Sequence, residues 1–312
     1  MTVSDEDLAI FQEARPRLFA IAYRMLGSAS DAEDVVQETF VRWQSCDRKV
    51  VETPPAWLSK VVSNLSLNRL SSAVNRREEY VGMWLPEPVL DADPYANPEA
   101  CFQQHESVSF ALLVLLERLS PTERAVFVLR EAFDYRHAEI ADYLGISESA
   151  SQQAFHRAKD RVGSEQRFAV EPHEAHRITA AFVDAAMSGD PNKLAELLTA
   201  DAIAVGDGGG IVPAATRPFQ GREKVSSFLT QLFESAPRMP QYTAGLRLYS
   251  VLVGGAPALL GVNDERLVMV LVMEVRDGAI SAIRNVANPH KLSYAYGQWK
   301  AHPDGHPLPY SW

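Results

Sequence analysis

Residues 136–162 read RHAEIADYLGISESASQQAFHRAKDRV, and this stretch decides how the first half of the chain folds. Two helical patterns, 136–144 and 147–162, are separated only by Gly145 and Ile146. A turn of this length that contains glycine is typical of a helix-turn-helix. The segment therefore predicts two helices packed around a tight corner.

The second of these helices has an apolar face and a polar face. Phe155, Ala158 and Val162 recur at helical spacing and are expected to be buried. The opposite face suits the major groove, where glutamine pairs with adenine and arginine with guanine. Its candidates for DNA contact are Ser149, Gln152, Gln153, His156, Arg157 and Lys159. A helical hairpin with no role in DNA binding stays an alternative, because the motif alone is only moderately specific.

Upstream of the helix-turn-helix, the sequence predicts three longer helices. The first spans 8–25 and ends at Gly27. The second begins at a capping box formed by Ser30 and Glu33 and reaches about residue 44. The third begins at Thr53, which is followed by two prolines, and reaches about residue 75.

A linker separates these helices from the helix-turn-helix. Residues 82–97 are rich in proline and acidic side chains and lack a helical period. Helices resume at about His105, and Ser120 and Glu123 form a second capping box. The first half is therefore expected to contain a helical domain at 1–81, a linker at 82–104 and a second helical domain at 105–168.

The second predicted helix carries an acidic stripe, defined here as Asp31, Asp34, Gln37 and Glu38. Steps of three and four residues place these side chains on one face, opposite apolar residues such as Val35. Such a face fits either a solvated surface or a docking surface for a partner protein. Spacing alone favours the solvated surface.

The third predicted helix is cationic in an otherwise acidic chain, because no aspartate or glutamate occurs between residues 53 and 77. Lys60, Asn64 and Asn68 recur at steps of four, which aligns donors of the kind that contact phosphates and bases. Trp57 offers either a surface for unstacked bases or a core side chain. The candidates for nucleic-acid contact are Trp57, Lys60, Asn64, Asn68, Arg69, Arg76 and Arg77.

After residue 172, the pattern changes from helices alone to helices and strands. Helices are expected around Phe182, over 194–198 and over 221–235. Strands are expected at 202–205, 245–253, 258–262, 267–275 and 279–286. The sum is an α+β domain, followed by a tail over 293–312 in which Pro, Gly and His are frequent.

Composition excludes several classes of protein. With 30 Lys plus Arg against 40 Asp plus Glu, the net charge is −10, so any nucleic-acid binding must be local. No apolar run is long enough to span a bilayer, and the acidic first residues do not resemble an export signal, so we expect a cytoplasmic protein. Cys46 and Cys101 form neither a zinc motif nor a disulfide framework and are expected to be buried free thiols. We expect no metal, no cofactor and a monomer.

The segment DAEDVVQETF at 31–40 resembles region 2.2 of the extracytoplasmic-function (ECF) sigma factors of bacterial RNA polymerase. The resemblance covers about the first half of the chain. It implies that the acidic stripe docks on core RNA polymerase, mainly on its β′ subunit with β as a further contact. It also implies that 53–77 with the following loop melts and reads the minus-ten element of promoter DNA, and that 149–159 reads the minus-thirty-five element. Gln152-Gln153-Ala154 replaces a basic run usual in the family, which predicts weaker, less salt-sensitive binding.

Ser188-Gly189-Asp190, followed by 194–198 and then by Asp201-Ala202, resembles the opening helices of a SnoaL-like domain. That domain has the cone-shaped NTF2-like fold that ketosteroid isomerase shares. A subgroup of ECF sigma factors carries such a domain, and the resemblance implies that residues 174–292 regulate the sigma factor from within. Ile211 and His290 stand where the subgroup commonly has lysine and aspartate. Three motifs are similar to those of the subgroup: Trp84-Leu85-Pro86-Glu87-Pro88, Asp207-Gly208-Gly209-Gly210 and Asn288-Pro289-His290-Lys291-Leu292. Because glycines let backbones approach closely, Asp207 could face the linker, and an ordinary flexible turn is the alternative for the glycine run.

Two other functions stay open. The cone could hold a small-molecule ligand or support proton transfer. No acid and base occur at a motif spacing, so we expect no enzyme. The loose catalytic candidates, which we expect to be surface or capping residues, are Asp184, Asp201, Asp207 and His176. A repressor that binds DNA without polymerase would leave the acidic stripe unexplained.

Overall fold

The computed structural model describes residues 5–47, 50–78, 80–91, 108–163 and 170–311. The chain forms two compact units. The first unit combines Met1–Glu79 with Leu112–Gln166, and the second combines Tyr80–Ala111 with Arg167–Trp312. The linker predicted at 82–104 therefore belongs to the same unit as the C-terminal domain.

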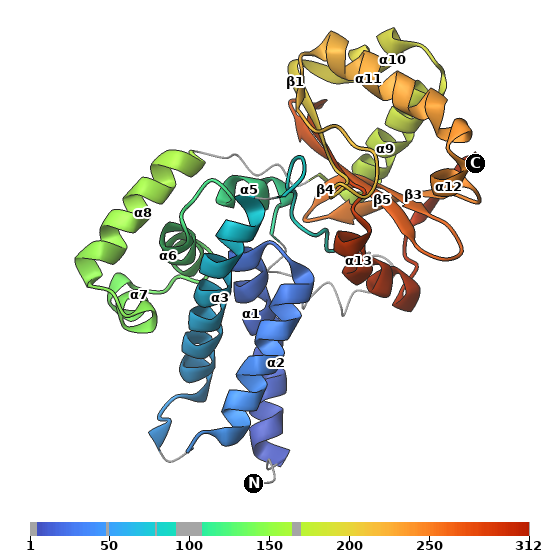
Figure 1. Ribbon diagram of the computed structural model, residues 1–312. Helices are drawn as coiled ribbons and strands as arrows, with labels where there is room; N and C mark the ends of the chain where they lie inside the picture. The colour runs from blue at the N-terminus through green and yellow to red at the C-terminus, as the bar shows by residue number, and fades with distance from the viewer. Residues whose placement is uncertain (1–4, 48–49, 79, 92–107, 164–169, 312) are drawn as a thin grey trace. The chain divides into compact units, whose positions relative to one another are not determined.

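Three long helices lie side by side in the first unit (Figure 1): α1 (Asp5–Leu26), α2 (Ala29–Ser45) and α3 (Pro54–Glu78). Their core includes Ile21, Val35 and Leu58, which are at most 1% exposed. The predicted helices are present, but the predicted cap of α2 is wrong. Ser28, not Ser30, is the N-cap, because its hydroxyl accepts a hydrogen bond from the backbone amide of Asp31 at 3.1 Å.

Four shorter helices lie within 108–163: α5 (Phe110–Leu116), α6 (Pro121–Glu131), α7 (His137–Leu144) and α8 (Glu148–Val162). The predicted capping box at the start of α6 is present. Gly145 adopts a φ of +66° and ends α7, so the corner uses the conformation that glycine supplies at least cost. The buried face of α8 is formed by Ser151, Ala154 and Ala158. Phe155 and Val162 were predicted to be buried but are only half-buried. The small side chains of Ser151, Ala154 and Ala158 lie on the face of α8 that packs closest to the neighbouring helices.

The second unit is built on a seven-stranded sheet in the order β2-β1-β6-β5-β4-β3-β7. Its strands are β1 (Leu198–Asp207), β2 (Phe219–Gln220), β3 (Arg247–Val253), β4 (Ala256–Val262), β5 (Leu267–Arg276), β6 (Ala279–Val286) and β7 (His306–Ser311). Strands β1 and β6 are parallel, and all other neighbours are antiparallel. All five predicted strands are present: β1, β4 and β5 are longer than predicted, β3 begins two residues later, and β6 has the predicted bounds.

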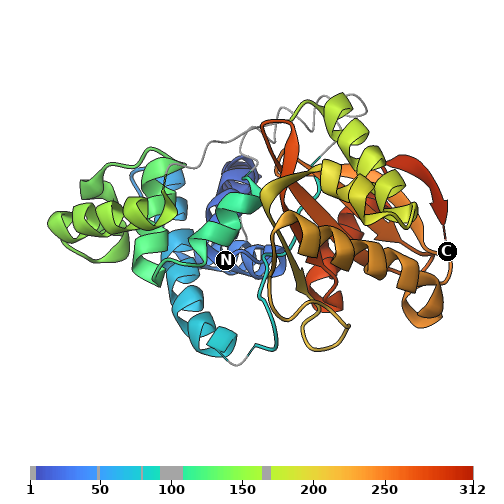
Figure 2. The same cartoon turned by 90° about the horizontal axis from the view of Figure 1, so that it is seen from above.

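Helices α9 (Pro172–Met187), α10 (Pro191–Glu196) and α11 (Arg222–Ser235) lie together on one face of the sheet (Figure 2). A short 3-10 helix (Ala236–Arg238) and α12 (Pro240–Thr243) connect α11 to β3. The predicted helix at 194–198 is partly wrong, because Leu198 already pairs with Ile280 as the first residue of β1.

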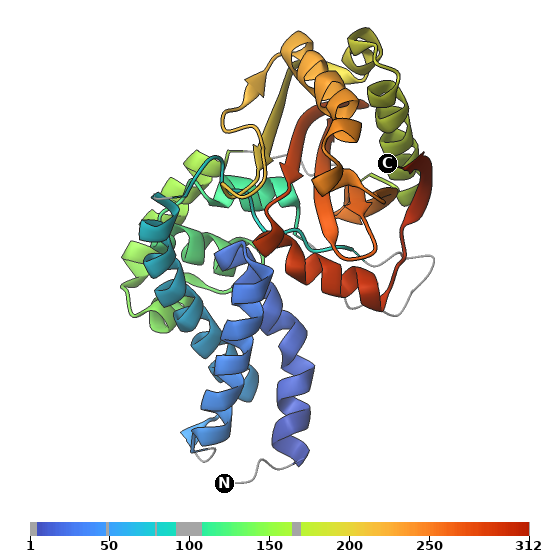
Figure 3. The same cartoon turned by 45° about the vertical axis from the view of Figure 1, so that its right-hand side comes forward.

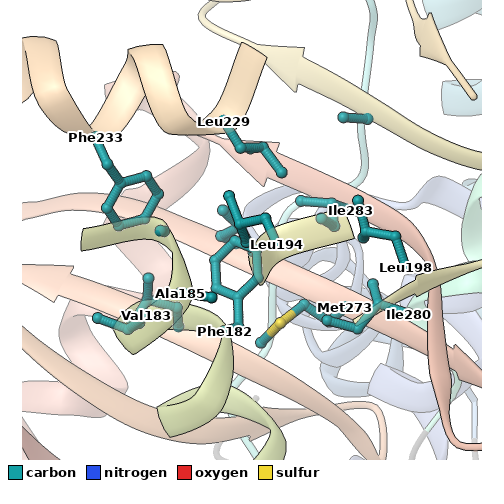
Figure 4. Close-up of a cluster of buried hydrophobic side chains, with 14 of the residues drawn as sticks. Phe182, Val183, Ala185, Leu194, Leu198, Leu229, Phe233, Met273, Ile280 and Ile283 are labelled. Carbon is teal, nitrogen blue, oxygen red and sulfur yellow. The ribbon is translucent and has the colours of Figure 1, made fainter. Parts of the chain in front are cut away.

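Apolar side chains fill the space between these helices and the sheet (Figure 4). Phe182 from α9 and Leu229 from α11 are at most 1% exposed, and they meet Met273 and Ile283 from the sheet. The interior of the predicted cone is thus a packed core.

The opposite face of the sheet is also apolar, since Val253, Leu260 and Val270 are at most 1% exposed. Helix α13 (Pro289–Ala301) covers part of it, with the ring of Trp299 4.7 Å from that of Tyr249. An antiparallel sheet with two buried faces needs a layer on each side, and α13 contributes to the second layer.

Residues 293–312 were predicted to be a tail, and this prediction is wrong. Most of α13 falls in this range, and β7 pairs with β3 at the edge of the sheet (Figure 3). Leu308 in β7 is 8% exposed and joins the core beside Phe182. The domain predicted at 174–292 therefore continues to Ser311, because the sheet needs β7 at its edge.

Within the part of the chain that the structure describes, no helix is long and apolar enough to cross a membrane. Cys46 forms no disulfide with a described residue and is half-buried rather than buried; its thiol donates to the carbonyl oxygen of Trp43 at 3.4 Å. Cys101 lies outside the described residues.

Candidate functional site

The acidic stripe lies on the outer face of α2. Asp34, Gln37 and Glu38 are exposed, and Asp31 is half-buried. Arg69 from α3 pairs with Asp31 at 2.6 Å and with Asp34 at 2.8 Å. The structure therefore joins Arg69, which was predicted to contact DNA, to the acidic stripe. Glu38 pairs with Arg42 of the same helix at 2.8 Å, and Gln37 is exposed beside it.

The polar row along α3 has partners of its own. Lys60 Nζ donates to Asp142 Oδ2 at 2.8 Å, and Asn64 Nδ2 donates to the backbone carbonyl oxygen of Tyr143 at 2.6 Å. Asn68 is exposed. Two of the three donors are thus engaged by α7, within the same unit.

The other candidates on α3 differ in accessibility. Trp57 is half-buried, and its ring centroid lies 5.6 Å from that of Trp43, which is 1% exposed. Trp57 therefore packs on the core with one side and keeps the other accessible. The side chains of Arg76 and Arg77 lie outside the described residues.

The polar face of α8 is open, since all six predicted side chains are exposed. Arg157 Nε donates to Glu123 Oε1 at 2.8 Å, and Lys159 lies 3.5 Å from a carboxylate oxygen of Glu131. Burial acts to raise the pKa of Glu123, but hydrogen bonds led by that from Arg157 outweigh it and lower the pKa. This ionised carboxylate fixes α8 on α6, and two cations of the face are partly neutralised.

A buried carboxylate, Asp207, holds the linker on the C-terminal domain. Asp207 ends β1 and is 1% exposed. Its Oδ1 accepts the hydroxyl of Tyr80 at 2.5 Å and its Oδ2 accepts the backbone amide of Leu85 at 2.8 Å. The expectation that Asp207 is a surface or capping residue is therefore wrong, because its oxygens are used to bind linker backbone and side chain.

Lys291, from the first turn of α13, supplies the opposite charge. Its Nζ donates to Asp207 Oδ2 at 2.6 Å and to the carbonyl oxygen of Leu85 at 2.5 Å. The ring centroid of Trp84 lies 3.9 Å from Nζ, which adds a cation–π contact. We call this group, Tyr80, Trp84, Leu85, Asp207, Asn288 and Lys291, the linker clamp.

The remaining members of the three motifs support the linker clamp. Asn288 Nδ2 donates to the Tyr80 hydroxyl at 2.8 Å, and Asn288 Oδ1 caps α13. A Cβ atom on Gly209, whose φ is +62°, would overlap the Asn288 side chain, so only glycine fits there. Burial, followed by the bond to Asp207, raises the pKa of Tyr80 and keeps its hydroxyl a donor. The buried residues of the described part of the linker are Leu85, Pro86, Glu87, Pro88 and Leu90.

A second attachment lies farther along the linker, at the turn between β3 and β4. The backbone amide and carbonyl of Leu90 both bond to the side chain of Gln298, at 2.9 and 3.2 Å. Asp91 Oδ2 accepts the backbone amide of Gly255 at 2.7 Å. A Cβ atom on Gly254 would overlap the carbonyl oxygen of Val108. This hairpin anchor, defined as Leu90, Asp91, Val108, Gly254, Gly255 and Gln298, therefore touches the linker before and after residues 92–107.

Gly254→Ala tests the hairpin anchor. We expect a loss of about 1–3 kcal/mol, because alanine is strained at a φ of +58° and its Cβ would displace Val108. Hydrogen exchange at the backbone of 108–110 should then accelerate. Gly255→Ala is the matched control, since it has a φ of +75° but open space around its Cβ. Equal exchange at 108–110 in both variants would show that Gly254 does not hold this segment.

A pocket of about 350 Å³ lies at the rim of the domain. Val81 and Gly82 of the linker line one side, and Ile211, Pro213 and Tyr242 line the other. Its walls are mainly apolar side chains and glycine backbone. The only large exposed apolar side chains in the described part of this unit, Val81 and Ile211, both border it.

The loose catalytic candidates are not brought together. Asp184 accepts the Tyr310 hydroxyl at 2.7 Å, and Asp201 pairs with Arg276 at 2.6 Å on the surface. The ring of His176 lies 4.9 Å from that of His306, and burial lowers the pKa of His176. Among the described residues, no group of three or more His, Cys, Asp or Glu could hold a metal ion.

Sequence reasoning missed the hairpin anchor and the role of Tyr80. The Gly-Gly pair at 254–255 is a turn signal, but no local pattern names its partner in the linker. Gln298 was hidden in the segment predicted to be a tail.

Comparisons with known proteins agree with this architecture. Residues 10–76 match the model for Sigma-70 region 2, and residues 109–162 match that for Sigma-70, region 4. The chain is 37% identical to ECF RNA polymerase sigma factor SigJ of Mycobacterium tuberculosis over 298 residues, which cover 92% of this chain and 93% of the relative. It is 30% identical to the probable ECF RNA polymerase sigma factor SigI of the same species over 299 residues, covering 94% and 97%.

The crystal structure of Mycobacterium tuberculosis extracytoplasmic function sigma factor SigJ superposes with a TM-score of 0.71 at 33% identity, covering 92% of this chain and 98% of that one. The predicted family and fold class are thus confirmed. Regions 2 and 4 fall in the first unit, and the C-terminal unit has the predicted SnoaL-like helix-and-sheet fold. The chain therefore belongs to the ECF RNA polymerase sigma factors, as a member that carries an additional C-terminal domain.

Proposed function

We propose that this sigma factor binds core RNA polymerase through the acidic stripe of α2, on the β′ subunit, and reads promoter DNA with α3 and α8. The exposure of Asp34, Gln37 and Glu38 on the outer face of α2 supports the docking role. In this proposal, α3 contacts the minus-ten element and the open face of α8 contacts the minus-thirty-five element. Because Arg157 and Lys159 are partly neutralised within the unit, α8 binding is expected to depend weakly on salt.

We propose further that the C-terminal domain regulates transcription by holding the linker. The observation that carries this proposal is the buried ion pair of Asp207 and Lys291. Asp207 accepts the backbone amide of Leu85, and Lys291 donates to the carbonyl oxygen of the same residue. A linker whose backbone is hydrogen-bonded to the C-terminal domain cannot adopt other paths between regions 2 and 4. The C-terminal domain thereby limits the arrangements that the two DNA-reading regions can take.

Run-off transcription with purified core RNA polymerase on a promoter library tests both proposals. The full chain is compared with a chain cut after Arg167, which lacks the domain that holds the linker. We expect promoter-dependent transcripts and a different transcript yield from the cut chain. Equal yields would make the C-terminal domain a passive attachment. Failure of both chains to bind core polymerase would instead favour a repressor.

We propose that the chain acts as a monomer and that its C-terminal domain has no catalytic role. The buried carboxylate of Asp207 is already bonded to Tyr80, Leu85 and Lys291 in the linker clamp. A small-molecule ligand would bind at the rim pocket rather than inside the cone, because apolar side chains fill the interior. A measured mass in solution near 34.5 kDa would support the monomer.

A further inference from the structure

The side of α3 that was assigned to promoter DNA is covered by α7 of region 4. Lys60 and Asn64, one helical turn apart, bond to Asp142 and to the carbonyl of Tyr143, which are consecutive residues. One short segment of region 4 thus engages two neighbouring donors of region 2.

The two acceptors on α7 match the chemistry that DNA offers. A DNA backbone presents anionic oxygens to ammonium groups, and base edges present carbonyl oxygens to side-chain amides. Asp142 presents a carboxylate oxygen to Lys60, and Tyr143 presents a carbonyl oxygen to Asn64. We propose that α7 is an internal competitor that occupies the minus-ten face of α3 until DNA displaces it. The inference rests on the proposed role of α3 in DNA binding.

Contacts elsewhere in the first unit hold region 4 in position for this competition. Arg124 of α6 is 1% exposed and donates from Nε to the carbonyl oxygen of Arg24 at 3.1 Å. The Arg17 guanidinium lies 5.1 Å from the ring centroid of Phe133 and 5.5 Å from that of Tyr135. These contacts fix α6 and the segment before α7 on α1, so they place α7 against α3.

The ion pair between Lys60 of α3 and Asp142 of α7 is weak enough for DNA to displace it. The side chains of Lys60 and Asp142 are 41% and 69% exposed. Ion pairs this exposed contribute little, because water and salt screen them. The buried contacts at Arg124 therefore position α7, whereas the exposed pair sets only how strongly it competes with DNA.

The experiment measures binding of the full chain to single-stranded DNA. Fluorescence anisotropy at low salt follows a labelled oligonucleotide pool of random sequence, since the promoter is not needed to detect competition. Asp142→Asn removes the anionic acceptor. Asp160→Asn, on the exposed side of α8, is the matched control, because it makes the same change in net charge without touching α3.

We expect Asp142→Asn to bind the pool about threefold more tightly than the Asp160→Asn variant, the size of effect typical of an exposed ion pair. Lys60→Gln in the Asp142→Asn background should remove this gain. Unfolding curves of all variants should coincide, because the altered side chains are exposed.

The outcomes separate the two proposals. Equal binding by Asp142→Asn and Asp160→Asn, together with weaker binding by Lys60→Gln, would overturn the internal competitor and keep the assignment of α3 to DNA. No effect of Lys60→Gln in either background would overturn that assignment, and the competitor with it.

Discussion

Lys291→Met is expected to lower the free energy of unfolding of the C-terminal unit by about 3–5 kcal/mol, the cost of leaving one partner of a buried ion pair unpaired. The side chains of Lys291 and Asp207 are 8% and 0% exposed, so water cannot compensate the remaining carboxylate. Leu85 also loses the donor on its carbonyl oxygen. Chemical denaturation measures the stability, and hydrogen exchange of 80–91 measures the release of the linker.

Two further variants make this result specific. Lys300→Met alters an exposed lysine of the same helix and should change stability little. The double variant Asp207→Asn with Lys291→Met removes both charges, and it should be more stable than Lys291→Met alone because no bare charge stays buried. A loss no larger than that of Lys300→Met would contradict the buried clamp.

Reversing the charge at Asp34 and Glu38 is expected to abolish binding to core RNA polymerase. The double change to lysine places two cations on the exposed part of the acidic stripe, and like charges across an interface cost several kcal/mol. It also sets cations beside Arg69 and Arg42, which now pair with Asp34 and Glu38. Co-purification with core polymerase, or a titration against it, provides the measurement.

Glu6→Lys with Glu13→Lys is the control for this double change. Both glutamates are exposed on α1, and the shift in net charge is the same. We expect this control to bind core polymerase as the unaltered chain does. If the Asp34 and Glu38 variant also co-purified normally, the acidic stripe would be a solvated surface and not a docking surface.

Periodic patterns predicted the elements of the first unit well, because helices with one apolar face leave a regular trace in the sequence. The helix-turn-helix corner was predicted because Gly145 lies between two helical patterns. The cap of α2 was misplaced because Ser28 and Ser30 both fit a capping pattern, and only the hydrogen bond to Asp31 distinguishes them. Local sequence patterns therefore predict the existence of a helix more reliably than the residue at which it begins.

The contacts between distant residues were harder to predict. Asn288 followed by Pro289 is a helix-start signal, so α13 could have been found, but β7 contains two prolines and does not look like a strand. The motif resemblance pointed to Asp207 and Lys291, whereas nothing local pointed to Gly254. Its partners lie more than one hundred residues away in the chain, and such pairings arise from the packed fold.

The hairpin anchor also couples two points of the chain that are separated in sequence. The turn between β3 and β4 contacts Asp91 through the backbone amide of Gly255 and Val108 through Gly254. These two neighbouring glycines thus hold both backbone segments, so a rearrangement of this one turn would release Asp91 and Val108 together.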